Sequence, residues 1–286
     1  MRIIKALKHL FYLNIEQYKY TRNLWFLCKS IVLQSIGALN LFTKRSQQYR
    51  WKVAERFNKP YLFTTWFWTY LCHTENAWSV MQKNYEPEIR EVILNNSKKN
   101  ANEREKYFIN IWTHIWRWAI DIVKNHNYKA ICFEPSPETF KYLKINTILS
   151  NVDKDIQLYN FWLWDKESMA DFEYMPSHDW SSRVVQKIDI NSEFASIIQI
   201  PIKKFDDLDI DKDILSKTRL IIMDVEWFEP FVLKGMEESL KHFSNIDIII
   251  EIFDSHEKKQ ETIEFMKNLW YQAKQIEKDN YLFSKK

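Results

Sequence analysis

The segment YFINIWTHIWRWAIDIVKNHNYKAICFEPSPETF, residues 107–140, alternates between two structural patterns. Its apolar runs at 107–111 and 130–133 have the length of buried strands, and the residues between them have the amphipathic spacing of a helix. A strand, a helix and a second strand in this order form the βαβ unit of a parallel sheet. Residues 107–140 therefore predict an α/β fold.

The same alternation continues toward the C-terminus. Further strand-like runs occur at 156–160, 220–223 and 247–252, and helical periodicity occurs at 137–149 and 228–243. The stretch 169–202 has β-rich pieces at 171–174, 183–188 and 197–202, and we interpret it as an insertion before the fourth main strand. We expect a parallel or mixed sheet with flanking helices.

Residues 1–84 differ from the rest in pattern and in charge. Their apolar residues have helix-like spacing, so we predict a mainly helical N-terminal extension, followed by one domain at 85–286. Residues 1–60 carry twelve Lys and Arg against Glu16 and Glu55, whereas the rest of the chain is net acidic. A polybasic segment of this kind suits peripheral contact with an anionic membrane. Its interleaved aromatic residues also suit nucleic acid, but a solvated helix face with inward aromatic side chains explains them, and we expect no nucleic-acid partner.

The cysteines and the N-terminus indicate a cytoplasmic protein. Cys28, Cys72 and Cys132 lie far apart with no Cys-x-x-Cys pair, which favours a reducing compartment and argues against a zinc site. The first residues lack the pattern of a cleavable signal, and polar residues interrupt the apolar stretch 24–42, so it does not predict a membrane span. We expect a cytoplasmic protein that contacts membranes through residues 1–60, with no bound metal.

Polar residues follow directly after the predicted strands. In an open α/β sheet ligands bind at the carboxyl ends of the strands, so Asn110, Glu134, Asn160 and Asp224 should converge on one crevice. A carboxylate after a second strand can accept hydrogen bonds from both hydroxyls of a ribose, and Glu134 occupies that place. The alternative is that Glu134 only caps the helix that begins near Pro137.

A dense acidic group, Asp224, Glu226 and Glu229, follows the strand at 220–223. Paired carboxylates can act as general acid and base or hold a metal ion. A solvated strand end is the alternative interpretation. The spacing matches no metal motif, so we expect proton chemistry here.

Several ordered motifs in residues 85–283 resemble the FkbM family of S-adenosylmethionine-dependent methyltransferases. They are YEPE at 85–88, FINIWTHIW at 108–116, FEPSP at 133–137, DKE at 165–167, FDDL at 205–208 and DVEWFEP at 224–230 followed by LKG at 233–235. The resemblance implies a Rossmann-like class I methyltransferase with flanking helices that uses S-adenosylmethionine and methylates a hydroxyl of a sugar, glycan or natural product. A small-molecule or glycan acceptor is therefore the expected partner.

The resemblance also assigns roles to individual residues. Trp112, Thr113, His114 and Trp116 would face the methionine part of the cofactor, Glu134 would bind the ribose, and Asn160 and Asp165 would lie near the adenine. Asp224 and Glu226 would line the transfer site as catalytic residues. Asn110 would also contact the cofactor, although the family usually has an acidic residue there.

Tryptophan stands at positions where the family has glycine or another small residue. The chain has two glycines and thirteen tryptophans, and the affected positions are Trp112, Trp116, Trp164, Trp180, Trp227 and Trp270. Glycine in such loops allows tight turns and a close approach of backbone to ligand, whereas an indole would fill the cofactor site. Two explanations remain open, a non-catalytic binding or scaffold relative, or a glycine codon rendered as tryptophan. The repeated use of one residue type favours the second.

Overall fold

The computed structural model describes residues 61–64, 69–72, 86–114, 117–174, 182–185, 196–255 and 257–285. The chain divides into two units, and the second, made of 84–174 and 180–286, contains every described element except the first two strands. Each unit is described by itself.

The described part of the first unit is a pair of short strands. β1 (Tyr61–Thr64) pairs antiparallel with β2 (Thr69–Cys72). These residues fall within the extension predicted as mainly helical, so the prediction is wrong for them. Their aromatic residues and threonines favour strands, and this preference outweighs the helix-like spacing. The rest of residues 1–84 lies outside the described residues.

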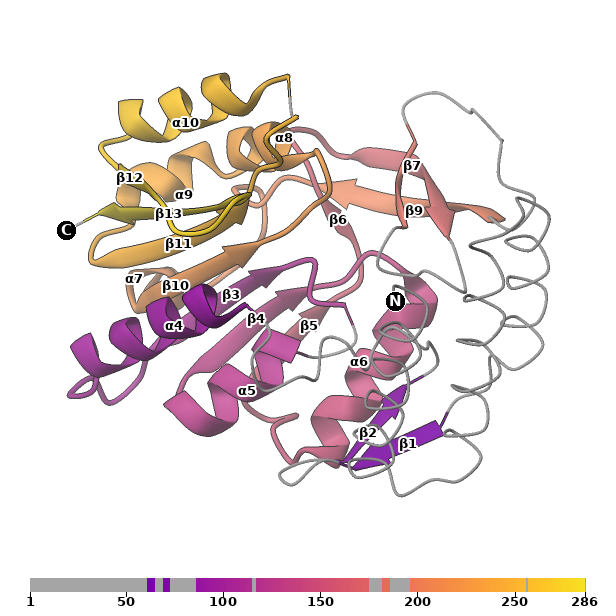
Figure 1. Cartoon of the computed structure of the whole chain (residues 1–286). Coiled ribbons are helices and arrows are strands. Elements are labelled where there is room, and N and C mark those ends of the chain that lie inside the picture. The colour runs from indigo at the N-terminus through magenta and orange to yellow at the C-terminus, as the bar shows by residue number, and fades with distance from the viewer. Residues whose placement is uncertain are drawn as a thin grey trace, which may run out of the picture. The chain divides into compact units, whose positions relative to one another are not determined.

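The second unit is built on a seven-stranded sheet with the order β12-β13-β11-β10-β3-β4-β5 (Figure 1). Its strands are β3 (Tyr107–Ile111), β4 (Lys129–Phe133), β5 (Ile156–Tyr159), β10 (Thr218–Met223), β11 (Ile246–Glu251), β12 (Gln272–Gln275) and β13 (Asn280–Lys285). The strands from β11 to β5 pair in parallel, and β13 runs antiparallel to both β11 and β12. All five predicted core strands are confirmed within one or two residues at each end.

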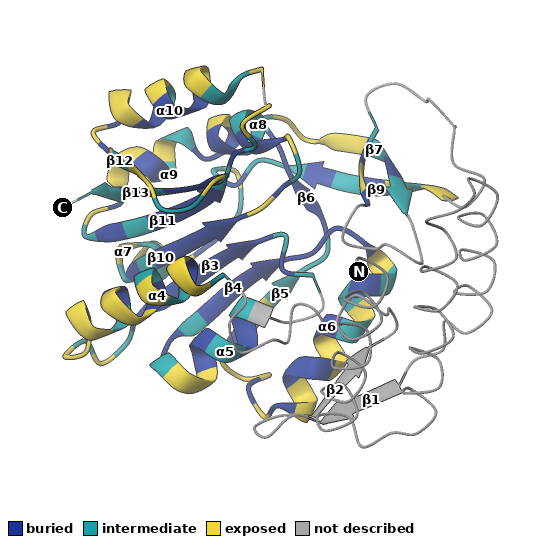
Figure 2. Ribbon diagram, viewed as in Figure 1, coloured by how far each residue is buried: buried dark blue, intermediate teal, exposed yellow. Residues whose placement is uncertain are grey.

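Helices cover both faces of this sheet (Figure 1). α4 (Pro87–Lys99) packs on β10, and α5 (Arg117–His126) packs on β3 and β4. On the opposite side lie α8 (Glu229–Gly235), α9 (Glu237–His242) and α10 (Lys259–Asn268). α7 (Lys212–Ser216) precedes β10, and α6 (Pro137–Leu149), which matches the predicted helix at 137–149, connects β4 to β5 with Ser136 as its N-cap. Figure 2 shows the central strands β3, β4, β10 and β11 as the most continuously buried part of this unit.

The single helix expected over 228–243 is instead two helices. α8 ends at Gly235 and α9 begins at Glu237, with Met236 between them at φ −125°. The carboxylate of Asp206 accepts hydrogen bonds from the amides of Glu238 and Ser239 at 2.9 Å each. A distant aspartate therefore caps α9 and starts a new helix, which helical periodicity alone does not reveal.

A four-stranded sheet, in the order β6-β9-β7-β8, follows β5 in the chain. β6 (Trp162–Leu163) runs parallel to β9 (Ser196–Lys203), which pairs antiparallel with β7 (Ser168–Tyr174), and β7 pairs with β8 (Arg183–Val184). The predicted insertion is therefore confirmed as β structure where it is described. Residues 186–188 of the expected second piece lie outside the described residues.

Gly235 joins α8 to the end of β6. A Cβ added at this position would overlap the carbonyl oxygen of Trp164. The Gly235 carbonyl also accepts a hydrogen bond from the Asp206 amide at 3.0 Å, and the Trp164 amide donates to Lys203 at 2.8 Å. The closest contacts between the end of β6 and α8 are therefore main-chain contacts, and the ring of Trp164 adds packing against Phe228 and Phe231.

Candidate functional site

Backbone hydrogen bonds join the carboxyl ends of neighbouring strands. The Asp224 amide donates to the Ile111 carbonyl at 3.4 Å, and the Thr113 amide donates to Phe133 at 2.8 Å. The Glu134 amide donates to Tyr159 at 3.0 Å. The residues that follow β10, β3, β4 and β5 consequently lie along one edge, where the sequence places the candidate site.

Glu134 is fully buried at this edge, and backbone amides orient its carboxylate. The amide of His114 donates to Oε2 at 2.8 Å, and the amide of Ser136 donates to Oε1 at 3.0 Å. The side chain that caps α6 is Ser136, whose Oγ accepts from the Thr139 amide at 3.3 Å. Glu134 is therefore not the helix cap, and its carboxylate is held against the loop that follows β3.

Asn160 and Asn110 flank Glu134 on the neighbouring strands. The Asn160 amide group donates to the carbonyls of Glu134 at 2.7 Å and Pro135 at 3.1 Å. Asn110 is 3% exposed, and its Oδ1 has no hydrogen-bond partner among the described residues. Thr113 is also buried and donates from Oγ1 to the Asn110 carbonyl at 3.1 Å.

Three of the suspect tryptophans have left-handed backbone conformations. The φ angles are 64° at Trp112, 82° at Trp227 and 71° at Trp270. A bulky residue rarely adopts positive φ, whereas glycine does so at no steric cost. The backbone at these positions therefore has the conformation of a glycine. Trp164 has no positive φ, and Trp116 and Trp180 lie outside the described residues.

The indole of Trp112 packs beside the candidate cofactor edge. Its ring centroid lies 5.7 Å from that of Trp162, and it contacts the hydrophobic core without being fully buried. The Trp162 Nε1 is a buried donor with no partner among the described residues. Trp227 is 39% exposed and stacks on Phe253 with centroids 5.2 Å apart.

Four carboxyl groups gather where β10 and β11 end and α8 begins. Burial raises the pKa of Glu229 to about 8, and Glu229 accepts a hydrogen bond from the Trp227 amide at 3.2 Å. Burial, followed by the charge of Glu251, raises the pKa of Glu226 to about 7. Burial also raises the pKa of Glu251 to about 9, with the charge of Asp224 as the second cause.

Asp224 is surrounded by many protein atoms, but its side chain remains accessible to water. Desolvation, followed by the charge of Glu226, raises its pKa to about 7. The residue is nevertheless exposed to solvent, so water moderates the desolvation. A carboxyl that titrates near neutral pH and remains accessible has the properties of a general base.

Two acidic residues near Asp224, Glu251 and Glu86, were not among the site residues predicted from the sequence. Glu251 ends β11 beside Asp224, one residue before the end of the strand predicted at 247–252. Glu86 precedes α4, and its charge also raises the pKa of Asp224. Glu86 lies in the YEPE motif, but the sequence alone does not reveal that it lies near Asp224, because the two residues are far apart in the chain.

The structure places Asp165 beside α8. Its carboxylate forms an ion pair with Lys234 at 3.4 Å, and its Cα lies close to Gly235. Among the contacts of the described residues, none joins Asp165 to Glu134 or Asn160. Its expected place near the adenine stays a prediction.

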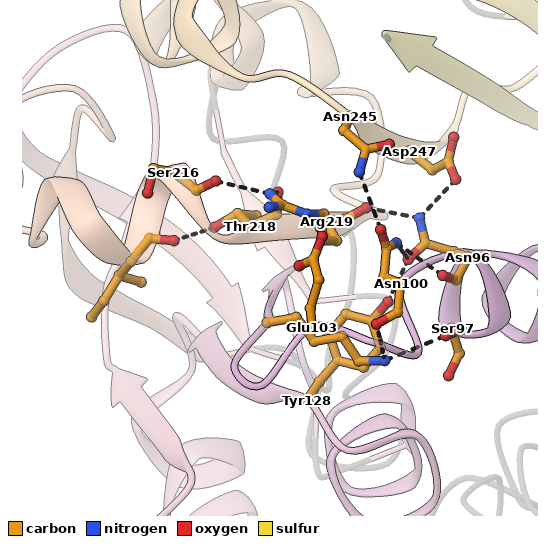
Figure 3. Close-up of polar contacts among 12 residues, drawn as sticks. Asn96, Ser97, Asn100, Glu103, Tyr128, Ser216, Thr218, Arg219, Asn245 and Asp247 are labelled. Atoms are coloured by element: carbon orange, nitrogen blue, oxygen red, sulfur yellow. Dashed lines mark hydrogen bonds and ion pairs between the residues drawn. The ribbon is translucent and has the colours of Figure 1, made fainter.

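The opposite edge of the sheet carries a buried polar network centred on α4 (Figure 3). Asn96 donates to the Arg219 carbonyl at 2.9 Å and to Asp247 at 2.7 Å, and it accepts from the Tyr128 hydroxyl. Asn100 donates to the Asn96 carbonyl at 2.9 Å. Because these polar groups satisfy one another, we interpret the network as an anchor that fixes α4 on the sheet.

Within the described ranges, no group of three or more His, Cys, Asp or Glu side chains is arranged to hold a metal ion. No helix in the part of the chain that the structure describes has the length and apolar character needed to cross a membrane.

The seven-stranded sheet, with β13 antiparallel between β11 and β12 and an acidic carboxyl edge, defines a class I methyltransferase fold. The chain belongs to the FkbM methyltransferase family, whose domain model matches residues 99–275.

Solved structures with similar folds are distant in sequence. Precorrin-6y C5,15-methyltransferase from Geobacter metallireducens GS-15 has a TM-score of 0.40 and 10% identity, covering 68% of this chain and 88% of its own. A putative transferase from Pyrococcus horikoshii has a TM-score of 0.41 and 12% identity, covering 83% and 82%. An RNA methyltransferase from Salinibacter ruber, solved with S-adenosyl-L-homocysteine, has a TM-score of 0.36 and 8% identity, covering 71% and 91%. No curated protein matches the sequence significantly.

Proposed function

We propose that this chain binds S-adenosylmethionine at the carboxyl edge of β3, β4 and β5 and methylates a hydroxyl oxygen of a sugar, glycan or other natural product. Membership of the FkbM family supports methyl transfer. A hydroxyl acceptor is supported by Asp224, because its carboxyl group is accessible at this edge and has a pKa near 7. A hydroxyl acceptor must lose its proton, and such a carboxylate can take it.

The described residues at this edge fit the cofactor. Amides hold the Glu134 carboxylate in one orientation, and a fixed carboxylate suits a ribose diol. Asn110 Oδ1 and Trp162 Nε1 are buried polar atoms without partners among the described residues. Buried atoms of this kind usually have a ligand or water partner. Asn160 would lie on the adenine side, and the loop with Trp112, Thr113, His114 and Trp116 on the methionine side.

Bound S-adenosylmethionine supplies an electrophilic methyl group. Asp224 accepts the proton of the attacking hydroxyl, and Glu226 orients the acceptor from the same loop. Much of the rate arises from holding the acceptor in line, which the strand ends favour because they are rigid.

Calorimetry with S-adenosylmethionine tests the cofactor assignment. We expect the variant Trp112→Gly, Trp116→Gly, Trp227→Gly to bind the cofactor more tightly than the chain that has tryptophan there. Labelled S-adenosylmethionine with a panel of glycans and lipids then identifies the acceptor by mass spectrometry. A folded triple variant that binds no cofactor contradicts the assignment.

The second candidate is a non-catalytic binding or scaffold protein of the same fold. The packing of Trp112 against Trp162 favours it, because this indole occupies space in the loop whose His114 amide binds Glu134. Under this alternative neither form of the chain binds S-adenosylmethionine. The same calorimetric comparison therefore separates the two functions.

A further inference from the structure

The pairing of β10 with β11 places Asp224 and Glu251 side by side. In this parallel pair Leu220 lies opposite Asp247 and Ile222 opposite Ile249. Side chains alternate between faces, so two residues further on Asp224 and Glu251 lie next to each other on the same face. This is the face that α4 covers, since Asp247 contacts Asn96 of that helix.

Both residues have fixed backbones. Glu251 pairs with Asn280 of β13 on its other side, and its neighbours Ile250 and Ile252 are fully buried. The Asp224 amide bonds to the Ile111 carbonyl at the end of β3. Their separation is therefore set by the sheet, not by a flexible loop.

The two carboxyl groups lie close enough to affect each other, and the charge of Asp224 is the second cause that raises the pKa of Glu251. Two ionised carboxylates repel each other and neither can donate a hydrogen bond, so the pair favours holding a proton. Glu251 faces Asp224, Asp279 and Glu277, and burial together with these charges raises its pKa to about 9. Glu251 therefore keeps its proton to higher pH than an ordinary glutamate does.

The other charges around the pair are also mainly acidic. Asp224 faces Glu226 and Glu229 from its own loop and helix, and Glu86 from the start of α4. Arg183 of β8 acts on Glu226, whose pKa it lowers. It forms an ion pair with Glu173 at 3.4 Å.

We propose that Glu251 is a positioning residue: its protonated carboxyl donates a hydrogen bond to Asp224 and fixes the orientation in which Asp224 accepts the acceptor proton. This inference rests on the proposed function of Asp224. The proton passes from the acceptor hydroxyl to the Asp224 oxygen that Glu251 does not engage. Glu251 keeps its own proton throughout the step.

Carboxyl-carbon NMR of the full chain, labelled at Asp and Glu, tests the shared proton without cofactor or acceptor. We expect the Asp224 and Glu251 signals each to show two inflections with pH, as coupled groups do. E251Q should remove from the Asp224 titration the inflection that it shares with Glu251 and leave the one due to Glu226, and the control E277Q should leave the shared inflection in place. Independent single-step titrations in the unsubstituted chain would overturn the proposal and leave the proposed methyl transfer untouched.

The pH profile of methyl transfer, measured with the acceptor found in the panel, tests the positioning role. Activity should rise as Asp224 ionises near pH 7 and fall as Glu251 ionises near pH 9. E251A should lower kcat by roughly tenfold or more with KM unchanged. E251Q keeps a donor, so it should restore most of this loss and remove the alkaline fall. An E251A variant with the original kcat and profile would overturn the proposal.

Discussion

The backbone amide of His114 donates a 2.8 Å hydrogen bond to Oε2 of Glu134, joining the loop after β3 to the end of β4. His114 itself has a φ of 56°, so this loop turns sharply to present its amide. The bond makes Glu134 both a cofactor ligand in the proposed function and a support of the loop.

Replacing Glu134 should weaken cofactor binding. In the chain with glycine at 112, 116 and 227, Glu134→Ala removes a charged acceptor and should cost about 1.5–3 kcal/mol of binding free energy. Titration calorimetry with S-adenosylmethionine measures this change. Glu138→Ala is the matched control, since Glu138 forms a surface ion pair with Lys141 at 2.6 Å. Equal dissociation constants for the two variants would refute the ribose role.

Asp224→Asn should reduce turnover more than cofactor affinity. The amide cannot take the hydroxyl proton, so we expect kcat to fall by roughly 10²–10⁴. The dissociation constant for S-adenosylmethionine should stay close to that of the parent. Asp153→Asn, at an exposed site, controls for the chemical change. A parent-like kcat in Asp224→Asn would remove Asp224 from the mechanism.

Stability should fall as pH rises from about 5 to 8. The raised pKa of Glu229, about 8 against a usual 4.5, means that the folded state binds more protons than the unfolded state in this range. Each pH unit then costs up to about 1.4 kcal/mol of unfolding free energy for such a group. Glu229→Gln should flatten this decline in urea titrations at several pH values, whereas Glu264→Gln on the exposed side of α10 should not. An unchanged slope in Glu229→Gln would show that Glu229 ionises normally.

Trp270→Gly should stabilise the protein. α10 ends in a Schellman motif, in which the Trp270 amide donates to Lys267 at 2.9 Å and the Tyr271 amide to Met266 at 3.1 Å. Trp270 occupies the left-handed position at φ 71° and is 84% exposed, so its side chain offers little packing in return. Relief of about 1–2 kcal/mol of left-handed strain exceeds the entropic cost of glycine in the unfolded chain.

Denaturant unfolding measures this gain. The control is Trp118→Gly in α5, where the same replacement falls within a right-handed helix and should destabilise by about 1 kcal/mol. Destabilisation by Trp270→Gly would mean that the indole makes contacts worth more than the backbone strain.

Asn96→Ala should destabilise the domain strongly. The substitution leaves Asp247, the Arg219 carbonyl and the Tyr128 hydroxyl without their shared partner, and each buried polar group left unpaired costs about 1–3 kcal/mol. Asn95→Ala is the matched control one residue earlier on the exposed side of α4. Similar melting temperatures for the two variants would show that the network does not anchor α4.

The sequence predicts the core strands because burial makes them largely apolar, with few polar residues such as Asn110 and Asp247. All five residues of β3 are buried, and the apolar run at 107–111 matches its bounds. The expected glycine-like positions agree with the positive φ of Trp112, Trp227 and Trp270. Trp164, which follows β6, does not have a positive φ, because the end of this strand needs no left-handed turn.

Features that depend on tertiary contacts were not predictable. The break between α8 and α9 at Met236 depends on Asp206, about thirty residues away in sequence. The strands β1 and β2 form where the spacing of apolar residues predicts a helix. Glu251 reaches the site only through the register of β11 against β10, which no local pattern encodes.

The junction at Gly235 bears on how acceptor specificity could be engineered. Main-chain contacts at Gly235 and the rings of Trp164, Phe228 and Phe231 fix α8 against the end of β6, so the β7–β8 hairpin contributes to this core mainly through the buried Phe172, which must be kept in any exchange. A hairpin from another family member could be grafted between residues 167 and 197, provided that Gly235, the Trp164 carbonyl and the Asp206 amide keep their places. Under the proposed function, methyl transfer by such chimaeras tests whether this insertion selects the acceptor.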